Sequence, residues 1–409
     1  MLMLALGIGM NLQLMNGTLL RELIIGHCRT TLPPYSPYNS IGDTVRILQL
    51  LWSRMESYGG IQSYIKTMTS ALKPIGTQVF THGLPSASNY QQVYPDAIPR
   101  ISTQDFSSTL TSLVHHYRAD IIETHNVLSG FTPAIAVQIT ECSRLCRIPH
   151  ITIMHDVQRP NTTIQWEYMQ HVLTGTHVIV TSEFNQNRFK RFFAQPTILL
   201  SPGIDFELFT PASKPNLRTV AYPGRLTALK GADDGIRLLG GLTHDLGKIT
   251  LLLSSKTQNC FGEHPSYFAE LDRVAAEYSA LTVLYNAGLD DVHKMYSDAA
   301  LTLVLSKYEG FGLVPLESIA SCRPVVAIPS GGMGWLYNVS GAICAPSLAG
   351  ASAGVKDVLN NWAVWHDKAV QSRKALKDLY DVRIIAARYL SVLRWVRERT
   401  PQCRPSCSS

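Results

Sequence analysis

The feature that most constrains the fold is a strand–turn–helix unit that recurs along the chain. Its first copy begins with VRILQLL at Val45, an apolar run of strand length that is typical of a buried parallel strand. Two glycines, Gly59 and Gly60, precede IQSYIKTMTSAL, where apolar residues recur at helical spacing at Ile61, Ile65, Met68 and Leu72. Strands that alternate with helices predict parallel sheets.

Two series of such units follow. The first contains the predicted strands ADIIETH, HITIMHD and THVIVTS, and the second contains RTVAYPG, KITLLLS, LTVLYNA, ALTLVLS and PVVAIPS. Prolines and glycines in SPGIDFELFTPASKP mark a linker at about residues 200–216. The 409 residues also exceed what one hydrophobic core usually fills. We therefore predict an α/β protein of two Rossmann-like domains with a cleft between them, at residues 44–200 and 201–380, followed by a C-terminal segment at 381–409.

The first 43 residues precede this alternation. Their apolar run MLMLALGIGM is too short to cross a bilayer, and no Lys or Arg stands before it, so we expect no cleaved signal. Prolines at Pro33, Pro34 and Pro37 favour loose packing of this extension. An extra packed helix, a weak interfacial anchor, or residues upstream of the true start are the alternatives.

Charge and cysteine content limit the class of partner. The net charge of +6 and the isoelectric point near 8.8 favour an anionic partner, such as a nucleotide phosphate, a lipid headgroup or nucleic acid. Eight cysteines are scattered, and the closest pairs, Cys142/Cys146 and Cys403/Cys407, lack the two-residue gap of zinc ribbons and redox dithiols. We expect reduced thiols and no metal site.

Polar residues stand at the carboxyl ends of several predicted strands. They are His125, His155, Asp156 and Ser182. Doubly wound sheets bind their ligands at this edge, so these side chains are candidates for a site. Capping or loop roles are the alternative for each.

Two glutamates flank a glycine-rich turn in SKYEGFGLVPLESIASCRPVV. Glu309 precedes the turn, and Glu317 lies in the helix that follows, in whose first turn Pro315 fits. Gly310 and Gly312 let the backbone approach a ligand closely, and the helix N-terminus offers free N–H groups to an anion.

With this E-x7-E pattern the sequence resembles the retaining glycosyltransferases of the GT-B fold, family 4, also called glycosyl transferases group 1. The elements PGRLTALKG, PGIDFELFTP and SYGGIQSY also follow that family, and the similarity extends from about Thr44 to Leu393. The resemblance implies GT-B architecture: two Rossmann-like domains whose parallel sheets face a central cleft. It also implies that the C-terminal helix crosses back to the first domain.

The resemblance assigns roles to individual residues. Arg225 and Lys230 would neutralise the leaving diphosphate without a metal, and Glu317 would hold the ribose hydroxyls. Glu309 would face the transferred sugar, and His155 would lie near it. The remaining contacts to the donor would come from Gly59, Gly60, Gly310, Phe311, Gly312 and Leu313.

The implied reaction moves a sugar from a UDP- or GDP-sugar to an acceptor hydroxyl with retention of configuration. The nucleotide sugar is the donor substrate, and no further cofactor is expected. The acceptor belongs to a glycan, a lipid or another molecule, and nucleic acid is not favoured. A sugar-nucleotide epimerase, a DNA-modifying glycosyltransferase and a non-catalytic nucleotide-sugar-binding subunit stay open as alternatives. We expect a cytoplasmic protein, with peripheral membrane contact as the alternative.

Two departures from the family pattern affect the sugar pocket. Gly334 and Trp335 stand where the family commonly has an acidic residue, and Cys322 stands where glycine is common. Neither change removes a predicted phosphate ligand, but both bear on which sugar fits.

The segment YDVRIIAARYLSVLRWVRER predicts an amphipathic basic helix near the C-terminus. Its apolar face carries Val382, Ile385, Tyr389, Val392 and Val396. We expect that face to pack on the first domain. An interfacial helix that uses Trp395 and its arginines against anionic lipid is the competing interpretation.

Overall fold

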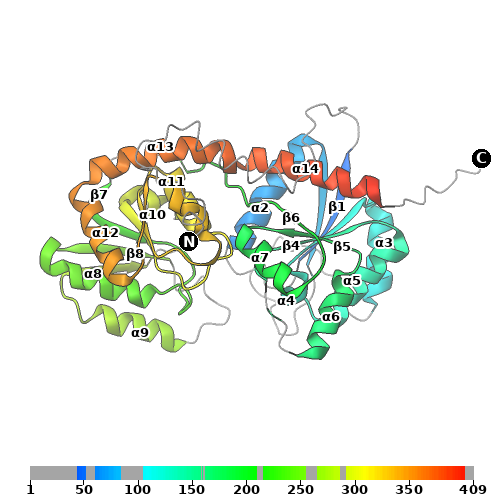
Figure 1. Cartoon of the computed structure of the whole chain (residues 1–409), viewed down its shortest axis with the longest axis horizontal. Coiled ribbons are helices and arrows are strands. Elements are labelled where there is room, and N and C mark those ends of the chain that lie inside the picture. The colour runs from blue at the N-terminus through cyan, green and yellow to red at the C-terminus, as the bar shows by residue number, and fades with distance from the viewer. Residues whose placement is uncertain are drawn as a thin grey trace, which may run out of the picture.

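The protein consists of two lobes that lie side by side, as Figure 1 shows for the computed structural model. The structure describes residues 44–51, 60–83, 105–157, 159, 162–209, 215–254, 265–285 and 292–400. Each lobe is built on a six-stranded parallel sheet. The predicted α/β class, with two parallel sheets in GT-B arrangement, is confirmed.

The first lobe carries the strand order β2-β1-β3-β4-β5-β6. Its strands are β1 Val45–Leu51, β2 Thr77–Gly83, β3 Ile121–His125, β4 His150–Met154, β5 Thr176–Val180 and β6 Thr197–Leu199. Its helices are α2 Gly60–Leu72, η4 Lys73–Ile75, α3 Phe106–Tyr117, α4 Val127–Gly130, α5 Pro133–Cys146, α6 Thr163–Leu173 and α7 Glu183–Phe192.

The second lobe carries the order β12-β11-β10-β7-β8-β9. Its strands are β7 Asn216–Tyr222, β8 Ile249–Leu253, β9 Leu281–Tyr285, β10 Ala299–Val304, β11 Val325–Ala327 and β12 Ala342–Cys344. Its helices are α8 Ala232–Leu246, α9 Pro265–Ala275, α10 Val292–Asp298, α11 Leu313–Ala320, η7 Gly331–Asn338, α12 Leu348–Asn360 and α13 Trp362–Tyr380.

The last helix, α14 Val382–Arg399, connects the two lobes. It follows α13 after a break at Asp381, whose carboxylate caps α14 by accepting from the backbone N–H of Arg383. Figure 1 shows α13 over the second lobe and α14 running on across the first. The predicted apolar face is buried against α2 and the first sheet, in one cluster with Ile47 and Met68.

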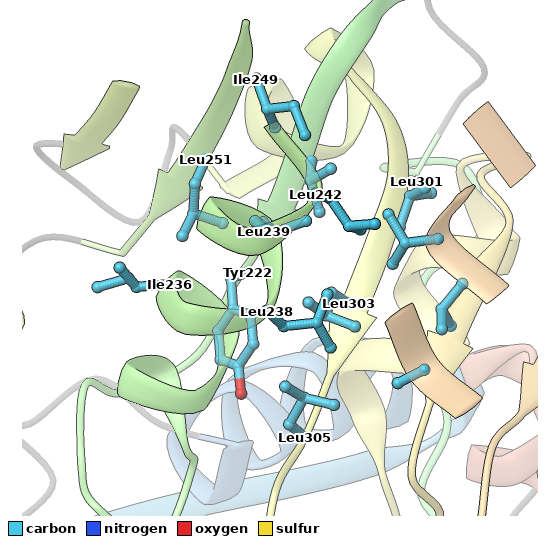
Figure 2. Close-up of a cluster of buried hydrophobic side chains, with 14 of the residues drawn as sticks. Tyr222, Ile236, Leu238, Leu239, Leu242, Ile249, Leu251, Leu301, Leu303 and Leu305 are labelled. Atoms are coloured by element: carbon cyan, nitrogen blue, oxygen red, sulfur yellow. The ribbon is translucent and has the colours of Figure 1, made fainter. Parts of the chain in front are cut away.

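Each sheet is covered on both faces, as its apolar strands require. In the first lobe, α2 and α14 cover one face, while α3, α5, α6 and α7 contribute to the cluster on the other. In the second lobe, the cluster around α8 is rich in leucine and includes Tyr222, whose hydroxyl oxygen points away from Leu239 and Leu242 in Figure 2. These cores hold the carboxyl ends of the strands in fixed positions.

Three strands were not among those predicted. β2 has the sequence TQVFTHG, in which polar residues interrupt the apolar run, and β6 and β12 have three residues each.

The backbone of Cys322 has φ of +56°, which explains why glycine suits this position. None of the helices in the described ranges is long and apolar enough to span a bilayer.

Candidate functional site

The topology brings two loops together at one edge of the second sheet. β7 and β10 pair with each other although β8 and β9 separate them in the sequence. Such a switch point opens a crevice beyond the carboxyl ends of the strands, where doubly wound sheets bind ligands. The loop after β7 carries Arg225 and Lys230, and the loop after β10 carries Glu309 to Gly312. In the first sheet the corresponding neighbours are β1 and β3, and β3 ends at His125.

The turn that carries Lys230 is anchored to the core of the second lobe. The Tyr222 hydroxyl donates to the carbonyl oxygens of Lys230 at 2.5 Å and Gly231 at 2.9 Å. Gly231 has φ of +70°, and a Cβ there would lie 2.9 Å from the carbonyl oxygen of Leu305. The backbone N–H of Lys307 donates to Leu229 at 2.8 Å, which joins the turn to the loop after β10. The position of Lys230 is therefore fixed by buried groups.

Lys230 and Glu309, two residues predicted from the sequence, form an ion pair. The Lys230 Nζ lies 2.6 Å from Glu309 Oε1, and their side chains are 24% and 13% exposed. A pair at this burial is screened less than a surface pair. Arg225 is exposed, and its guanidinium makes no hydrogen bond within the described ranges. The structure thus places one predicted cation against the glutamate and leaves the other facing solvent.

The glycine loop from Glu309 to Gly312 packs tightly against η7. The Gly332 N–H donates to the Glu309 carbonyl at 2.7 Å, and a Cβ on Gly332 would lie 2.0 Å from the carbonyl oxygen of Gly310. Trp335, one of the departures from the family pattern, donates its indole N–H to the Phe311 carbonyl at 2.9 Å and stacks on the Phe311 ring. Trp335 therefore braces the loop.

The second glutamate, Glu317, has a different environment from Glu309. It lies on α11, which begins at Leu313, and Oε2 accepts a hydrogen bond of 2.7 Å from the hydroxyl of the buried Tyr296. Burial raises the pKa of the Glu317 carboxyl above its ordinary value, although the hydrogen bond from Tyr296 opposes this shift. Glu317 is thus held by the interior of the second lobe rather than by a cation.

His155 from the first lobe meets the glycine loop. A Cβ on Gly310 would lie 2.2 Å from the carbonyl oxygen of His155, so only glycine fits there. The Ser182 hydroxyl donates to the Gly310 carbonyl at 2.6 Å, and the Asn185 amide donates to the His155 carbonyl at 3.0 Å. Burial, together with the neighbouring His125, holds the pKa of the His155 imidazole well below its ordinary value.

A second contact between the lobes lies beside this one. The Tyr308 hydroxyl donates to the Asp156 carboxylate, and Tyr308 also packs edge-on against Phe184 of α7. Burial and the Asp156 charge raise the pKa of the Tyr308 hydroxyl. The lobes are therefore joined by polar contacts directly at the candidate site.

The glycine pair near the first strand is described only in part. A Cβ on Gly60 would lie 3.4 Å from Leu313 Cδ1, so the start of α2 faces the start of α11. Gly59 lies outside the described residues. The sequence analysis did not identify Tyr308 or Asn185 as site contacts, because each bonds to a partner from a distant part of the chain.

Metal ligands do not gather in the part of the chain that the structure covers. No three His, Cys, Asp or Glu side chains of the described residues form a group that could hold an ion. Cys142 and Cys146 are free thiols on α5, with their sulfur atoms 3.8 Å apart.

Two family models match adjoining parts of the chain. The model described as Glycosyltransferase Family 4 matches residues 58–208, and the one described as Glycosyl transferases group 1 matches residues 204–375. A curated relative, the D-inositol 3-phosphate glycosyltransferase of Segniliparus rotundus, is 22% identical over 317 residues, which is 67% of this chain and 70% of the relative. The chain spans about half the length of several other curated relatives, between 37% and 56%.

Solved structures share the fold over most of the chain. Sucrose-phosphate synthase from Thermosynechococcus elongatus has a TM-score of 0.69 at 17% identity and covers 86% of this chain and 99% of its own. The Anabaena protein Alr3699/HepE, in complex with UDP and glucose, has a TM-score of 0.68 at 18% identity and covers 86% and 100%. At these identities the similarity shows a shared fold and no more.

Proposed function

Because the chain belongs to the group 1 and family 4 glycosyltransferases, we propose that it transfers a sugar from a nucleotide diphosphate to an acceptor hydroxyl with retention of anomeric configuration. The observation that carries this proposal is the Lys230–Glu309 pair, 2.6 Å apart at the switch point of the second sheet. A fixed, partly buried cation beside a glycine loop suits a group that develops negative charge during the reaction.

Lys230 and Arg225 receive the leaving diphosphate in this proposal. Glu309 balances the charge of Lys230 in the structure. Diphosphate oxygens would replace the carboxylate as the partner of Lys230, and the exposed Arg225 is free to close on them without breaking a contact in the described structure. Glu309 would then turn to the transferred sugar. Charge-assisted hydrogen bonds from two cations stabilise a diphosphate strongly.

The reaction needs no separate nucleophile on the protein. The bond from the anomeric carbon to the phosphate oxygen breaks while the acceptor oxygen forms its bond on the same face. The acceptor proton passes to the leaving phosphate oxygen, and the negative charge stays on the diphosphate. Holding both substrates in this geometry supplies much of the rate enhancement.

The other predicted contacts complete the donor site. Glu317 would accept hydrogen bonds from ribose hydroxyls, and the backbone N–H groups from Gly310 to Leu313 would bind the sugar. The nucleotide sugar is the donor substrate, and no additional cofactor is proposed. The UDP and glucose bound by the Anabaena neighbour support a UDP-sugar as the first donor to try, with a GDP-sugar second. His155 would lie near the transferred sugar, and the first lobe would face the acceptor, a hydroxyl of a glycan or lipid.

The experiment uses the full chain with a panel of UDP- and GDP-sugars, each with and without acceptors. Glycan, lipid and DNA acceptors form separate arms, and products are separated by chromatography. Sugar transferred to an acceptor supports the proposal. Epimerised donor would instead show an epimerase of the same fold, and donor binding without turnover in any arm would show a non-catalytic subunit.

A further inference from the structure

A tyrosine of α10 binds one oxygen of the Glu317 carboxyl. Tyr296 is fully buried, and its hydroxyl lies 2.7 Å from Glu317 Oε2 and 3.4 Å from the carbonyl oxygen of Val314. A hydroxyl has one proton to donate, and the Glu317 oxygen is the nearer acceptor. The other oxygen, Oε1, makes no hydrogen bond to a residue that the structure describes. One oxygen of the carboxyl is therefore occupied by the protein, and the other is left for a ligand.

This division between the two oxygens holds in both protonation states of the carboxyl. Burial raises the pKa of Glu317, and the hydrogen bond with Tyr296 lowers it. Tyr296 is bonded to Oε2 whether the carboxyl is charged or neutral. A ribose hydroxyl both donates and accepts, so it can pair with Oε1 whether or not that oxygen carries a proton.

A buried arginine fixes the position of Tyr296. Arg323 is 1% exposed, and its guanidinium donates from Nε to the Tyr296 carbonyl at 2.9 Å and from Nη2 to the Ser297 carbonyl at 2.8 Å. These carbonyls lie in the last turn of α10, where a helix leaves C=O groups without a partner of its own and favours a cation. The Tyr296 ring packs edge-on against Phe209, at 5.9 Å between centroids. Both the backbone and the ring of Tyr296 are thus held in place.

Glu317 lies on the side of α11 that faces the first lobe. It follows Leu313 by four positions, so the two residues share one face of the helix. Leu313 Cδ1 lies 3.4 Å from the position that a Cβ on Gly60 of α2 would take. The Glu317 side chain is half-buried, so a ligand between the lobes can contact it.

We propose that Tyr296 is a positioning residue that holds Glu317 with Oε1 toward the ribose of the donor, so that the site selects ribonucleotides over nucleotides without ribose hydroxyls. A site built to bind a hydroxyl rejects an analogue that lacks it, because a polar group of the site is then left unpaired. This inference rests on the proposed function for its ligand, and it adds the residue that gives the ribose contact its geometry.

The test measures the affinity of the full chain for UDP, for GDP and for their dideoxy analogues, which lack both ribose hydroxyls, by isothermal titration calorimetry. For the diphosphate that binds more tightly, we expect loss of the hydroxyls to weaken binding to the wild type by on the order of a hundredfold. In Tyr296→Phe the affinity for the ribonucleotide should fall about tenfold, while that for the dideoxy analogue stays within about twofold. Glu317→Ala should bind the two nucleotides about equally.

Tyr389→Phe is the matched control. Tyr389 is also buried and donates its hydroxyl to a buried carboxylate, that of Glu123 in the first lobe. This variant loses the same kind of hydrogen bond away from the donor site, so the ratio of the two affinities should stay within about twofold of the wild-type ratio. In a Glu317→Ala background, Tyr296→Phe should no longer change the ratio, because the two residues act through one contact.

The outcomes separate this inference from the proposed function. An equal loss of affinity for both nucleotides in Tyr296→Phe would show that Tyr296 supports only the fold, and no loss for either would show that Glu317 keeps its position without Tyr296. Equal binding of both nucleotides to the wild type would show that the ribose hydroxyls are not recognised. Each of these results overturns the inference and leaves the proposed function standing. If the wild type binds neither UDP nor GDP, the proposed function fails, and this inference fails with it.

Discussion

The two lobes have the same architecture but different interiors. Among the described residues of the first lobe, the buried acidic and histidine side chains are His82, Glu123, His125 and His150. The second lobe buries Arg323, and its largest cluster is composed of leucine, isoleucine, valine and alanine around Tyr222. The first lobe therefore has a polar interior, whereas the second carries a charged pair on an apolar core.

This difference predicts which substitutions change only the turnover and which also change the stability. Lys230 and Glu309 lie at the rim of the second lobe, on turns fixed by backbone hydrogen bonds, so their side chains can change without loss of the core. His155 instead belongs to a network that also holds α14 in place through Tyr389. Substitutions of Lys230 should thus alter turnover alone, whereas those in the polar network of the first lobe should alter stability as well.

The largest expected effect comes from Lys230→Ala. Removing a preorganised cation from the diphosphate site should lower turnover by on the order of a hundredfold, and Arg225→Ala should act similarly. Thermal unfolding should be unchanged, because Lys230 contributes no core contact. Lys356→Ala is the control, since it breaks an exposed ion pair of similar length, 2.7 Å, with Asp245. Full turnover in both Lys230→Ala and Arg225→Ala would refute the diphosphate site.

In the first lobe, the matching change is Tyr389→Phe. It deletes one hydrogen bond to the buried Glu123 carboxylate, which should cost about 1.5–3 kcal/mol of unfolding free energy. Urea unfolding of this variant is compared with that of Tyr168→Phe, whose hydroxyl is unpartnered among the described residues and whose loss should be nearly neutral. Equal stability of the two variants would show that α14 does not depend on the network.

We expect acid to lower the stability of the first lobe more than that of the second. Burial lowers the pKa of His150 to about 3, and it also lowers the pKa values of His155 and His177, all in the first lobe. Below the ordinary value of 6.5 the unfolded chain binds protons that the folded lobe does not, so stability is lost as pH falls, by up to about 1.4 kcal/mol per pH unit for each histidine.

Hydrogen exchange can follow this loss in each lobe separately. Protection of β4 should fall with acid before that of β8, after correction for intrinsic exchange rates. His150→Gln should flatten the pH dependence in β4, whereas His244→Gln, at a side chain that is 95% exposed, should not. Parallel loss of protection in β4 and β8 would mean that the buried histidines do not distinguish the lobes.

We expect the smallest effect, a change in vesicle binding, from replacing the arginines of α14. Because the apolar face of this helix is buried against the first lobe, replacing Arg388, Arg394 and Arg397 by alanine should change vesicle co-sedimentation little. Tight, salt-sensitive binding to anionic vesicles that the triple variant abolishes would show that α14 also meets a membrane. It would then point to a lipid-linked acceptor.

The sequence predicted the strands that are long and apolar, and with them the parallel sheets. It did not predict β6 or β12, because three residues are too few to show a period. In the site, the family resemblance identified Lys230 and Glu309, which are 79 residues apart and whose contact no local pattern indicates.

The contacts between lobes could not be predicted in the same way. Ser182 was a candidate as a strand-end residue, but its bond to Gly310 spans 128 positions. Tyr389 was placed correctly on the apolar face of its helix, while its hydroxyl bonds to Glu123, 266 positions away. A signal was present: a carboxylate inside the buried strand IIETH requires buried partners.

The anomeric configuration of the product tests the central claim most directly. The claim is that both lobes act on one nucleotide sugar, with Lys230 receiving the diphosphate and the acceptor attacking on the same face. The full chain is incubated with the donor and acceptor that support transfer, and the anomeric configuration of the new linkage is read by NMR. The account predicts the same anomeric configuration in product and donor. An inverted anomer would contradict it.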